Sequence, residues 1–248
     1  MIILKSQAEL KKMSGACRIV AEILEGLKSH VADGITTADI EAFVDEGLRK
    51  RGAVAAFRGY RGFPSSVCVS VNEQVIHGIP SGSARIKNGD IVSIDLGAVF
   101  EGFFGDAAIT VPVGNISQQA RRLMEVTEQS LQYGIEMVVE GNRIGDISSA
   151  IQKHVEANGY SVVRAFVGHG IGRSLHEDPA VPNFGKPGQG PRLKEGMTLA
   201  IEPMVNAGGC DVRILADDWT AVTADGSLSA HFEHTVAVTK KGPKILTK

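Results

Sequence analysis

The stretch that decides the fold is GDIVSIDLGAVFEGFFGDAAITVPV, residues 89–113. Two runs of β-branched and other apolar residues lie on either side of Glu101-Gly102, and this pattern predicts an antiparallel hairpin. Each run carries one carboxylate, Asp95 or Asp106. A turn at Glu101-Gly102 places residues whose numbers sum to about 201–203 opposite each other. We therefore expect the two carboxylates to face one another, within roughly 5–8 Å.

Two more carboxylates lie in apolar, strand-like sequence: Glu202 in TLAIEPMV and Glu233 in HFEHTVAV. One carboxylate in such a strand is usually an edge residue or half of a local ion pair. Four need a shared cause, and no comparable set of lysines or arginines lies in these strands, so a bound cation is the better partner. Four negative charges predict two divalent ions, and oxygen ligands with an imidazole favour Mn, Fe(II), Co or Zn.

The chain also resembles itself at a shift of 107 residues. Under that shift Gly34, Asp39, Gly52 and Asp95 fall on Gly141, Asp146, Gly159 and Glu202. VIHGI at 75–79 likewise resembles VGHGI at 167–171. Chance is the alternative, because any α/β chain repeats helices and glycines. We expect one α+β domain, residues 1–248, of two helix–helix–sheet halves (about 1–113 and 114–248) related by a pseudo-two-fold axis.

Capping and periodicity predict four helices. They begin at Ser6, near Thr37, at Ser117 and at a cap formed by Asp146, and the third runs to about Glu140. The predicted strands are 67–71, 91–96, 107–113, 162–167, 198–205 and 235–239.

Composition excludes several classes of protein. The chain has 248 residues, 43% apolar and 22% charged, with a formal net charge of -2. That balance excludes intrinsic disorder and argues against a dedicated nucleic-acid binder. Three scattered cysteines and the lack of an apolar stretch of about 18 residues predict a cytoplasmic protein with no membrane segment. Tyr60, Phe63, Arg58 and Arg61 form a small basic–aromatic cluster, which we interpret as a solvated loop, so no specific nucleic-acid site is expected.

Three histidines lie in motifs that suit a metal-binding or catalytic role. His169 lies in GHGIG, His77 is its counterpart in HGIP, and His176 follows in SLHEDP. Imidazoles from both halves beside an acidic centre suit metal ligation and oxyanion stabilisation.

Seven motifs, taken together and in order, resemble the type I methionine aminopeptidases over essentially the whole chain. They are HGIP at 77–80, GDIVSIDLG at 89–97, GD at 105–106, GHGIG at 168–172, HEDP at 176–179, IEPM at 201–204 and FEHT at 232–235. The resemblance implies the duplicated α+β fold called pita-bread, found in creatinases and aminopeptidases. It also implies a dinuclear metal centre whose ligands are Asp95, Asp106, His169, Glu202 and Glu233.

The resemblance further implies individual roles. Asp106 and Glu233 would bridge the two ions, Glu202 would also relay a proton, His176 would stabilise the tetrahedral intermediate, and His77 would contact the scissile nitrogen. The methionine pocket would be lined by Tyr60, Phe63, Cys68 and Trp219. Phe63 stands where tyrosine is common and Leu175 where an aromatic residue is common, which bears on pocket shape rather than on chemistry.

The implied activity is removal of N-terminal methionine from nascent proteins when the second residue is small. The implied partners are methionyl peptides, nascent chains and the ribosome near its exit site, with a monomeric enzyme. An Xaa-Pro aminopeptidase of the same fold is one alternative, although such enzymes usually carry a large domain ahead of the catalytic one and this sequence shows none. A metal-free peptide-binding relative should have replaced some ligands, and a phosphoesterase or nuclease should show a phosphate-binding loop.

Overall fold

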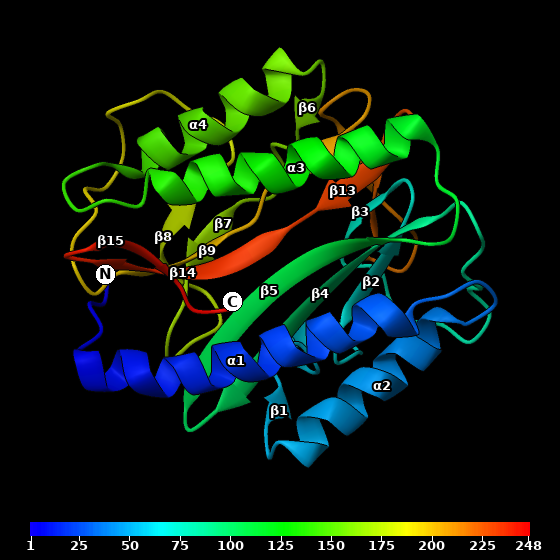
Figure 1. Ribbon diagram of the computed structural model, residues 1–248, viewed down its shortest axis with the longest axis horizontal. Coiled ribbons are helices and arrows are strands. Elements are labelled where there is room, and N and C mark those ends of the chain that lie inside the picture. Colours follow the sequence, from blue (N-terminus) through cyan, green and yellow to red (C-terminus); the bar gives the residue numbers. More distant parts are fainter.

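The hairpin of residues 89–113 forms the centre of the main sheet in the computed structural model, which describes residues 1–248 (Figure 1). Its strands are β4 (Ile91–Phe100) and β5 (Phe103–Pro112), and Phe100 pairs with Phe103 across the turn. Glu101 and Gly102 both have positive φ, 49° and 76°. A two-residue turn of this kind matches the twist of the strands that it joins. The predicted hairpin is confirmed.

The remaining strands extend this hairpin into a curled sheet. Its order is β1-β4-β5-β14-β9-β7-β8, with β2 also on β4 and β15 also on β14. The bounds of these strands are β1 (Val54–Ala55), β2 (Cys68–Val71), β7 (Gly168–Gly170), β8 (Glu177–Val181), β9 (Thr198–Ile201), β14 (Glu233–Thr239) and β15 (Gly242–Ile245).

Two three-stranded sheets lie beside the main one, in the orders β13-β10-β6 and β11-β12-β3. They comprise β3 (Gln74–Ile76), β6 (Ser161–Val162), β10 (Met204–Asn206), β11 (Val212–Ile214), β12 (Ala221–Thr223) and β13 (Ser229–His231). The strand predicted over 162–167 is wrong, because extended structure stops at Val162 and resumes in β7. The strand predicted over 198–205 is interrupted at 202–203, where Pro203 has no N–H to donate to a ladder.

Four helices were predicted and four form: α1 (Gln7–His30), α2 (Thr37–Lys50), α3 (Gln118–Glu136) and α4 (Ile144–Ala157). Ser6 begins α1 with the expected capping box, since its Oγ accepts from Glu9 N–H and Glu9 accepts from Ser6 N–H. Asp146 is not the cap of α4. It occupies the third helical position and accepts from the N–H of Arg143, the capping residue, at 2.7 Å. None of the helices combines the length and apolarity needed to cross a membrane.

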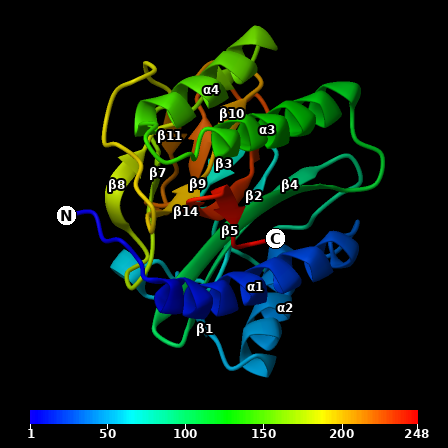
Figure 2. The same ribbon diagram turned by 60° about the vertical axis from the view of Figure 1, so that its left-hand side comes forward.

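The helices cover one face of the main sheet in two pairs. Figures 1 and 2 show α1 and α2 at one end of the sheet and α3 and α4 at the other. Ile94 and Leu96 of β4 pack among residues of α1 and α2, whereas Leu199 and Ile201 of β9 pack among residues of α3 and α4. Each such side chain contributes roughly 1.5–3 kcal/mol when fully buried. Since side chains alternate along a strand, the residues between them face the opposite side of the sheet, where the candidate site lies.

Candidate metal centre

Three of the four strand carboxylates lie in one row across the sheet. Asp95 on β4 and Glu233 on β14 both pair with Ala108 of β5. His234 pairs with Ile201, so Glu202, the residue directly after β9, continues the row beside Glu233. By this register Glu202 and Glu233 stand opposite each other.

Asp106 and His169 lie in a neighbouring row on the same face. Asp106 pairs with Gly97, two residues from the Asp95–Ala108 pair, and His169 pairs with Ala200, two residues before Glu202. A step of two residues keeps a side chain on the same face of a sheet. The prediction that Asp95 and Asp106 face each other directly is therefore wrong, because they are diagonal neighbours.

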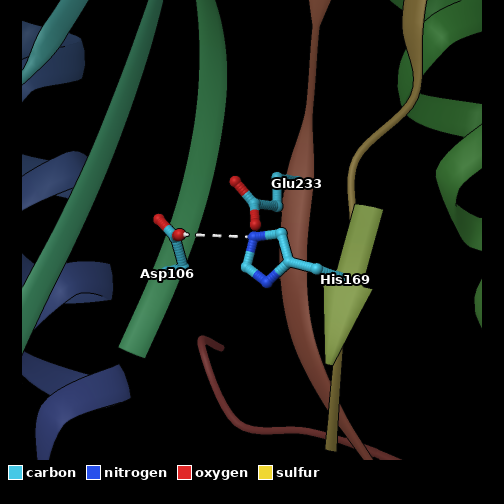
Figure 3. Close-up of side chains that lie close together, drawn as sticks. All are labelled: Asp106, His169 and Glu233. Atoms are coloured by element: carbon cyan, nitrogen blue, oxygen red, sulfur yellow. Dashed lines mark ion pairs between the residues drawn. The ribbon is translucent and has the colours of Figure 1, made fainter. Parts of the chain in front are cut away.

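The five side chains from these rows approach one another closely. His169 Nε2 lies 3.5 Å from Glu202 Oε1 and 4.0 Å from Asp106 Oδ2. One ligand atom each of Asp106, His169 and Glu233 lies within 4.8 Å of the others (Figure 3). The Nδ1 of His169 is 2.8 Å from the carbonyl oxygen of Gly170. Because a carbonyl only accepts, Nδ1 carries the proton, and the Nε2 lone pair of the neutral ring points at the carboxylates.

Burial dominates the electrostatics of this centre. It raises the pKa of Asp95 to about 7, and it raises the pKa values of Asp106, Glu202 and Glu233 well above their usual range. The neighbouring carboxylates raise the last three further, since each negative charge opposes the next. Burial also lowers the pKa of His169 to about 3, so its ring is neutral and available as a ligand at physiological pH.

The donor set fits divalent metal ions. Asp95 Oδ1, Asp106 Oδ1 and Glu233 Oε1 are buried and accept no hydrogen bond. Buried oxygens are almost always satisfied, and unpaired buried carboxylates are strongly destabilising, so this arrangement fits a bound cation. Four carboxylates and one imidazole match the ligand preferences of Mn, Fe(II), Co and Zn.

A cavity of about 140 Å³ opens onto the carboxylates. Every residue assigned to the site from sequence lines it. Leu175, which was expected to bear on pocket shape, also lines it, and three lining residues were given no role there: Phe57, Arg61 and Ile76. Ile76 directly precedes His77 in the sequence, and this adjacency was the available signal. Arg61 was interpreted as solvated, and indeed it is exposed, but at the mouth of the cavity.

His176 and His77 occupy different walls of the cavity. The His176 ring centroid is 4.1 Å from that of His169, and its Nδ1 is 2.9 Å from the Tyr60 hydroxyl. Burial, and next the charge of Arg61, lower the pKa of His176. Burial lowers the pKa of His77 to about 4. His77 also has a φ of 61°, a costly conformation for a non-glycine residue that is concentrated at functional sites.

The apolar wall is formed by aromatic rings and a thiol. Phe63 and Trp219 meet edge to face at 5.1 Å between centroids. Cys68 pairs with Asp95 across the strands, and burial raises the pKa of its thiol well above the usual value. The thiol is therefore protonated and acts as a small, polarisable apolar group.

The loop that carries Tyr60 and Phe63 is fastened to α2. Arg58 Nη2 donates to Glu41 Oε1 at 3.0 Å and to Asp45 Oδ2 at 2.8 Å. These ion pairs neutralise Arg58 and leave Arg61 as the exposed cation of the basic–aromatic cluster.

His231 is a further buried group that sequence reasoning missed. Its Nε2 lies 3.9 Å from Glu202 Oε2 and makes no hydrogen bond. Its position two residues before Glu233 was the available signal.

Comparisons with known proteins show similarity to metallopeptidases over nearly the whole chain. The sequence profile described as metallopeptidase family M24 matches residues 11–240. The chain is 57% identical to a methionine aminopeptidase of Clostridium perfringens over 100% of this chain and 99% of that one. It is 54% identical to methionine aminopeptidase 1 of Bacillus subtilis over the whole of both chains.

Solved structures of methionine aminopeptidases have the same fold as this chain. A methionine aminopeptidase from Thermotoga maritima superposes with a TM-score of 0.99, at 48% identity and with full coverage of both chains. A prolidase from Pyrococcus furiosus superposes with a TM-score of 0.81 at 24% identity, covering 99% of this chain and 65% of that one, which shows a shared fold alone.

Proposed function

The chain belongs to metallopeptidase family M24 and is a metal-dependent methionine aminopeptidase. We propose that five of its side chains hold two divalent ions for this reaction. The proposed ligands are Asp95, Asp106, His169, Glu202 and Glu233, with Asp106 and Glu233 shared between the ions. The close grouping of Asp106, His169 and Glu233, with buried carboxylate oxygens that accept no hydrogen bond, is the observation that carries the proposal. Two divalent ions would balance the four carboxylate charges, whereas one would leave half of them uncompensated.

The bound ions would supply Lewis acidity, which lowers the pKa of water toward 7 and polarises the peptide carbonyl. Glu202 would accept a proton from the attacking water and deliver it to the leaving amine. With Nδ1 of His176 accepting from Tyr60, the neutral ring carries its proton on Nε2 and can donate it to the developing oxyanion. His77 would contact the nitrogen of the scissile bond from its own wall of the cavity.

The cavity supports selection of one residue at the chain end. Its volume of about 140 Å³ is well below the ~300 Å³ of the smallest typical ligand pockets. It therefore suits one side chain, and we propose that Tyr60, Phe63, Cys68 and Trp219 bind the methionine thioether. Because the cavity suits only one side chain, we propose that the second residue of the substrate lies at its mouth and is small.

We further propose that the two halves, about 1–113 and 114–248, arose by duplication. The bridge between Thr36 and Arg85 has a counterpart 107 residues later, between Arg143 and Arg192. The helices α2 and α4 begin and end at the same interval, and Gly34, like its counterpart, has positive φ. Identical local pairings at one fixed shift support duplication over chance.

Protein N-termini become available as chains are synthesised, and this supports nascent chains as substrates. We propose that the enzyme acts on them as a monomer in the cytoplasm, near the ribosomal exit site.

The test is release of free methionine from a Met-Ala-Ser peptide by protein stripped of metal and reloaded with Mn, Fe(II), Co or Zn. We expect up to two ions per chain, and activity that returns with loading. Full activity with a single bound ion would contradict the dinuclear centre. Faster cleavage of Xaa-Pro peptides than of Met-Ala-Ser would favour the specificity of the prolidase relatives.

A further inference from the structure

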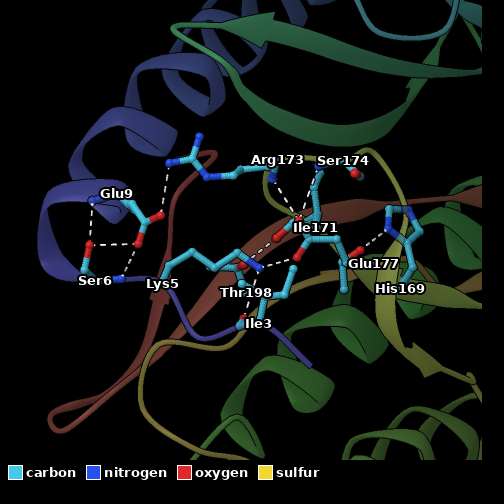
Figure 4. Close-up of polar contacts among 11 residues, drawn as sticks. Ile3, Lys5, Ser6, Glu9, His169, Ile171, Arg173, Ser174, Glu177 and Thr198 are labelled. Carbon is cyan, nitrogen blue, oxygen red and sulfur yellow. Dashed lines mark hydrogen bonds and ion pairs between the residues drawn. The ribbon is translucent and has the colours of Figure 1, made fainter. Parts of the chain in front are cut away.

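A buried ion pair lies beside the metal centre but outside the cavity. Lys5 precedes α1, and Glu177 begins β8 directly after His176. The Lys5 ammonium contacts Glu177 Oε2, and the two side chains are only 3% and 5% exposed (Figure 4). Removing two charges from water is costly, and apolar replacements of such pairs are often neutral or stabilising. Stability alone therefore gives a weak reason for the pair.

Glu177 closes a loop on itself. Its second oxygen, Oε1, accepts from the backbone N–H of Arg173 at 2.8 Å and of Ser174 at 3.3 Å. One carboxylate thus fixes both the start and the end of the segment that leads to His176. Charge-assisted hydrogen bonds of this kind are about twice as strong as neutral ones.

Lys5 fastens this loop to the start of α1. Its Nζ also donates to the Ile3 carbonyl at 3.2 Å, and its backbone N–H donates to the Gly196 carbonyl at 2.7 Å. Arg173 Nη2 reaches Glu9 of the α1 capping box at 3.2 Å (Figure 4). The loop is therefore tied at two points, to Lys5 just before α1 and to Glu9 in its first turn.

The ion pair is packed directly against the loop backbone. A Cβ built on Gly172 would lie 2.3 Å from Lys5 Cε and 2.7 Å from Glu177 Oε1. Gly172 is also held by β5, since its carbonyl accepts from Phe104 N–H at 2.8 Å. Because no space separates the pair from the backbone, a shift of the pair must move the loop.

We propose that Lys5 and Glu177 are positioning residues for His176, an inference that rests on the proposed function. The one hydrogen bond to the His176 ring comes from Tyr60, while its main chain is set by the adjacent Glu177. Neither Lys5 nor Glu177 lines the cavity, so they act through His176 rather than on the substrate. A displacement of about 1 Å in a catalytic group costs roughly 10²-fold in rate.

The test uses the double variant Lys5→Met/Glu177→Gln. It removes both charges at similar volume, and the glutamine oxygen can still accept from the loop N–H groups. We expect kcat for Met-Ala-Ser to fall about 10- to 100-fold, with KM within about twofold of the parent and unchanged metal content. The single variant Glu177→Gln, which keeps the acceptor, should show a smaller fall in kcat and serves if the double variant does not fold.

The matched control is Arg51→Met/Glu22→Gln, which removes a surface ion pair of 2.9 Å and should leave kcat unchanged. The decisive comparison repeats the Lys5→Met/Glu177→Gln change in a His176→Ala background, where we expect no further loss of kcat. An equal loss in both backgrounds would show a general structural role and overturn the inference while leaving the proposed function intact. If His176→Ala itself left kcat unchanged, the proposed role of His176 would fail, and the positioning role with it.

Discussion

Replacing Asp106 by asparagine is expected to affect stability in opposite directions with and without metal. The change keeps the shape of the side chain and removes one of four buried charges. Ligand atoms of Asp106 and Glu233 lie within 4.8 Å of each other. Two unit charges at that distance repel by roughly 3–4 kcal/mol at an effective dielectric constant near 20. Since burial raises the pKa of Asp106, protonation already relieves part of this repulsion, and we expect a gain of about 1–3 kcal/mol for the metal-free protein.

Calorimetry in the presence and absence of chelator measures this difference. For a chain of this size, roughly 2–4 °C per kcal/mol predicts that Asp106→Asn raises the Tm of the stripped protein by about 2–12 °C. With metal at about 1,000 times Kd the parent protein gains about 4.1 kcal/mol, which exceeds the advantage of about 1–3 kcal/mol of the stripped variant, and the variant gains little because it has lost a shared ligand. The order of the two melting temperatures should therefore reverse on adding metal, and turnover of the variant should be abolished.

Asp211→Asn is the matched control, because Asp211 is exposed and its removal should change stability by less than about 0.5 kcal/mol with or without metal. A stripped Asp106→Asn protein that melts below the parent would refute the repulsion argument. Near-normal turnover at the parental metal content would refute the role of Asp106 as a shared ligand.

Three further outcomes are expected. Trp219→Ala should lower kcat/KM for methionyl peptides about 10-fold and narrow the preference for methionine over leucine in competition assays, since it removes one apolar wall of the slot. Arg61 is the one lysine or arginine lining the cavity, so Arg61→Gln should reduce the ratio of kcat/KM for Met-Ala-Glu-Ser over Met-Ala-Lys-Ser amides by about two- to fivefold, and less at high salt. Hydrogen bonds from Ser227 and from Gly209 N–H lower the pKa of Asp225 to about 2, so its contribution to stability is present above pH 4 and is lost as pH falls toward 2. Denaturant titrations across that range should show a flatter pH dependence for Asp225→Asn.

The register of the central hairpin was predictable from the sequence to within two residues. Once Glu101-Gly102 is a two-residue turn, Phe100 pairs with Phe103, and Asp95 must then pair with Ala108. The uncertainty lay in the turn, because glutamate is uncommon at positive φ and gives a weaker signal than asparagine or aspartate. The carboxylates converge in either register, because a change of two residues keeps both on the same face.

The starts of the helices could be predicted from neighbouring residues in the sequence, whereas the short strands could not. Capping residues act within one turn, so Ser6 and Thr36 mark their helices directly. The three-residue strand that carries His169 contains two glycines and has no periodicity of its own. Gly168 lets this strand approach β9, which is distant in sequence. A Cβ at Gly168 would lie 2.4 Å from the Ala200 carbonyl oxygen, so a larger residue would prevent the contact. Close approach of this kind is a tertiary property, and sequence shows only that glycine permits it.

The candidate metal centre lies beside the short join between β5 and β14. The strands β5 and β14 pair through only two residue pairs, Ala108 with Glu233 and Ala107 with His234. At the next residue pair, the Thr235 hydroxyl takes the place of the backbone hydrogen bonds between the strands. Its Oγ1 accepts from Asp106 N–H at 3.1 Å and donates to the Asp106 carbonyl at 2.7 Å. A short join leaves carboxylates from both halves facing one space, where their repulsion would push the strands apart. Because neither half alone supplies four carboxylates and an imidazole, a cation held there stabilises the association of the halves as well as the geometry for catalysis.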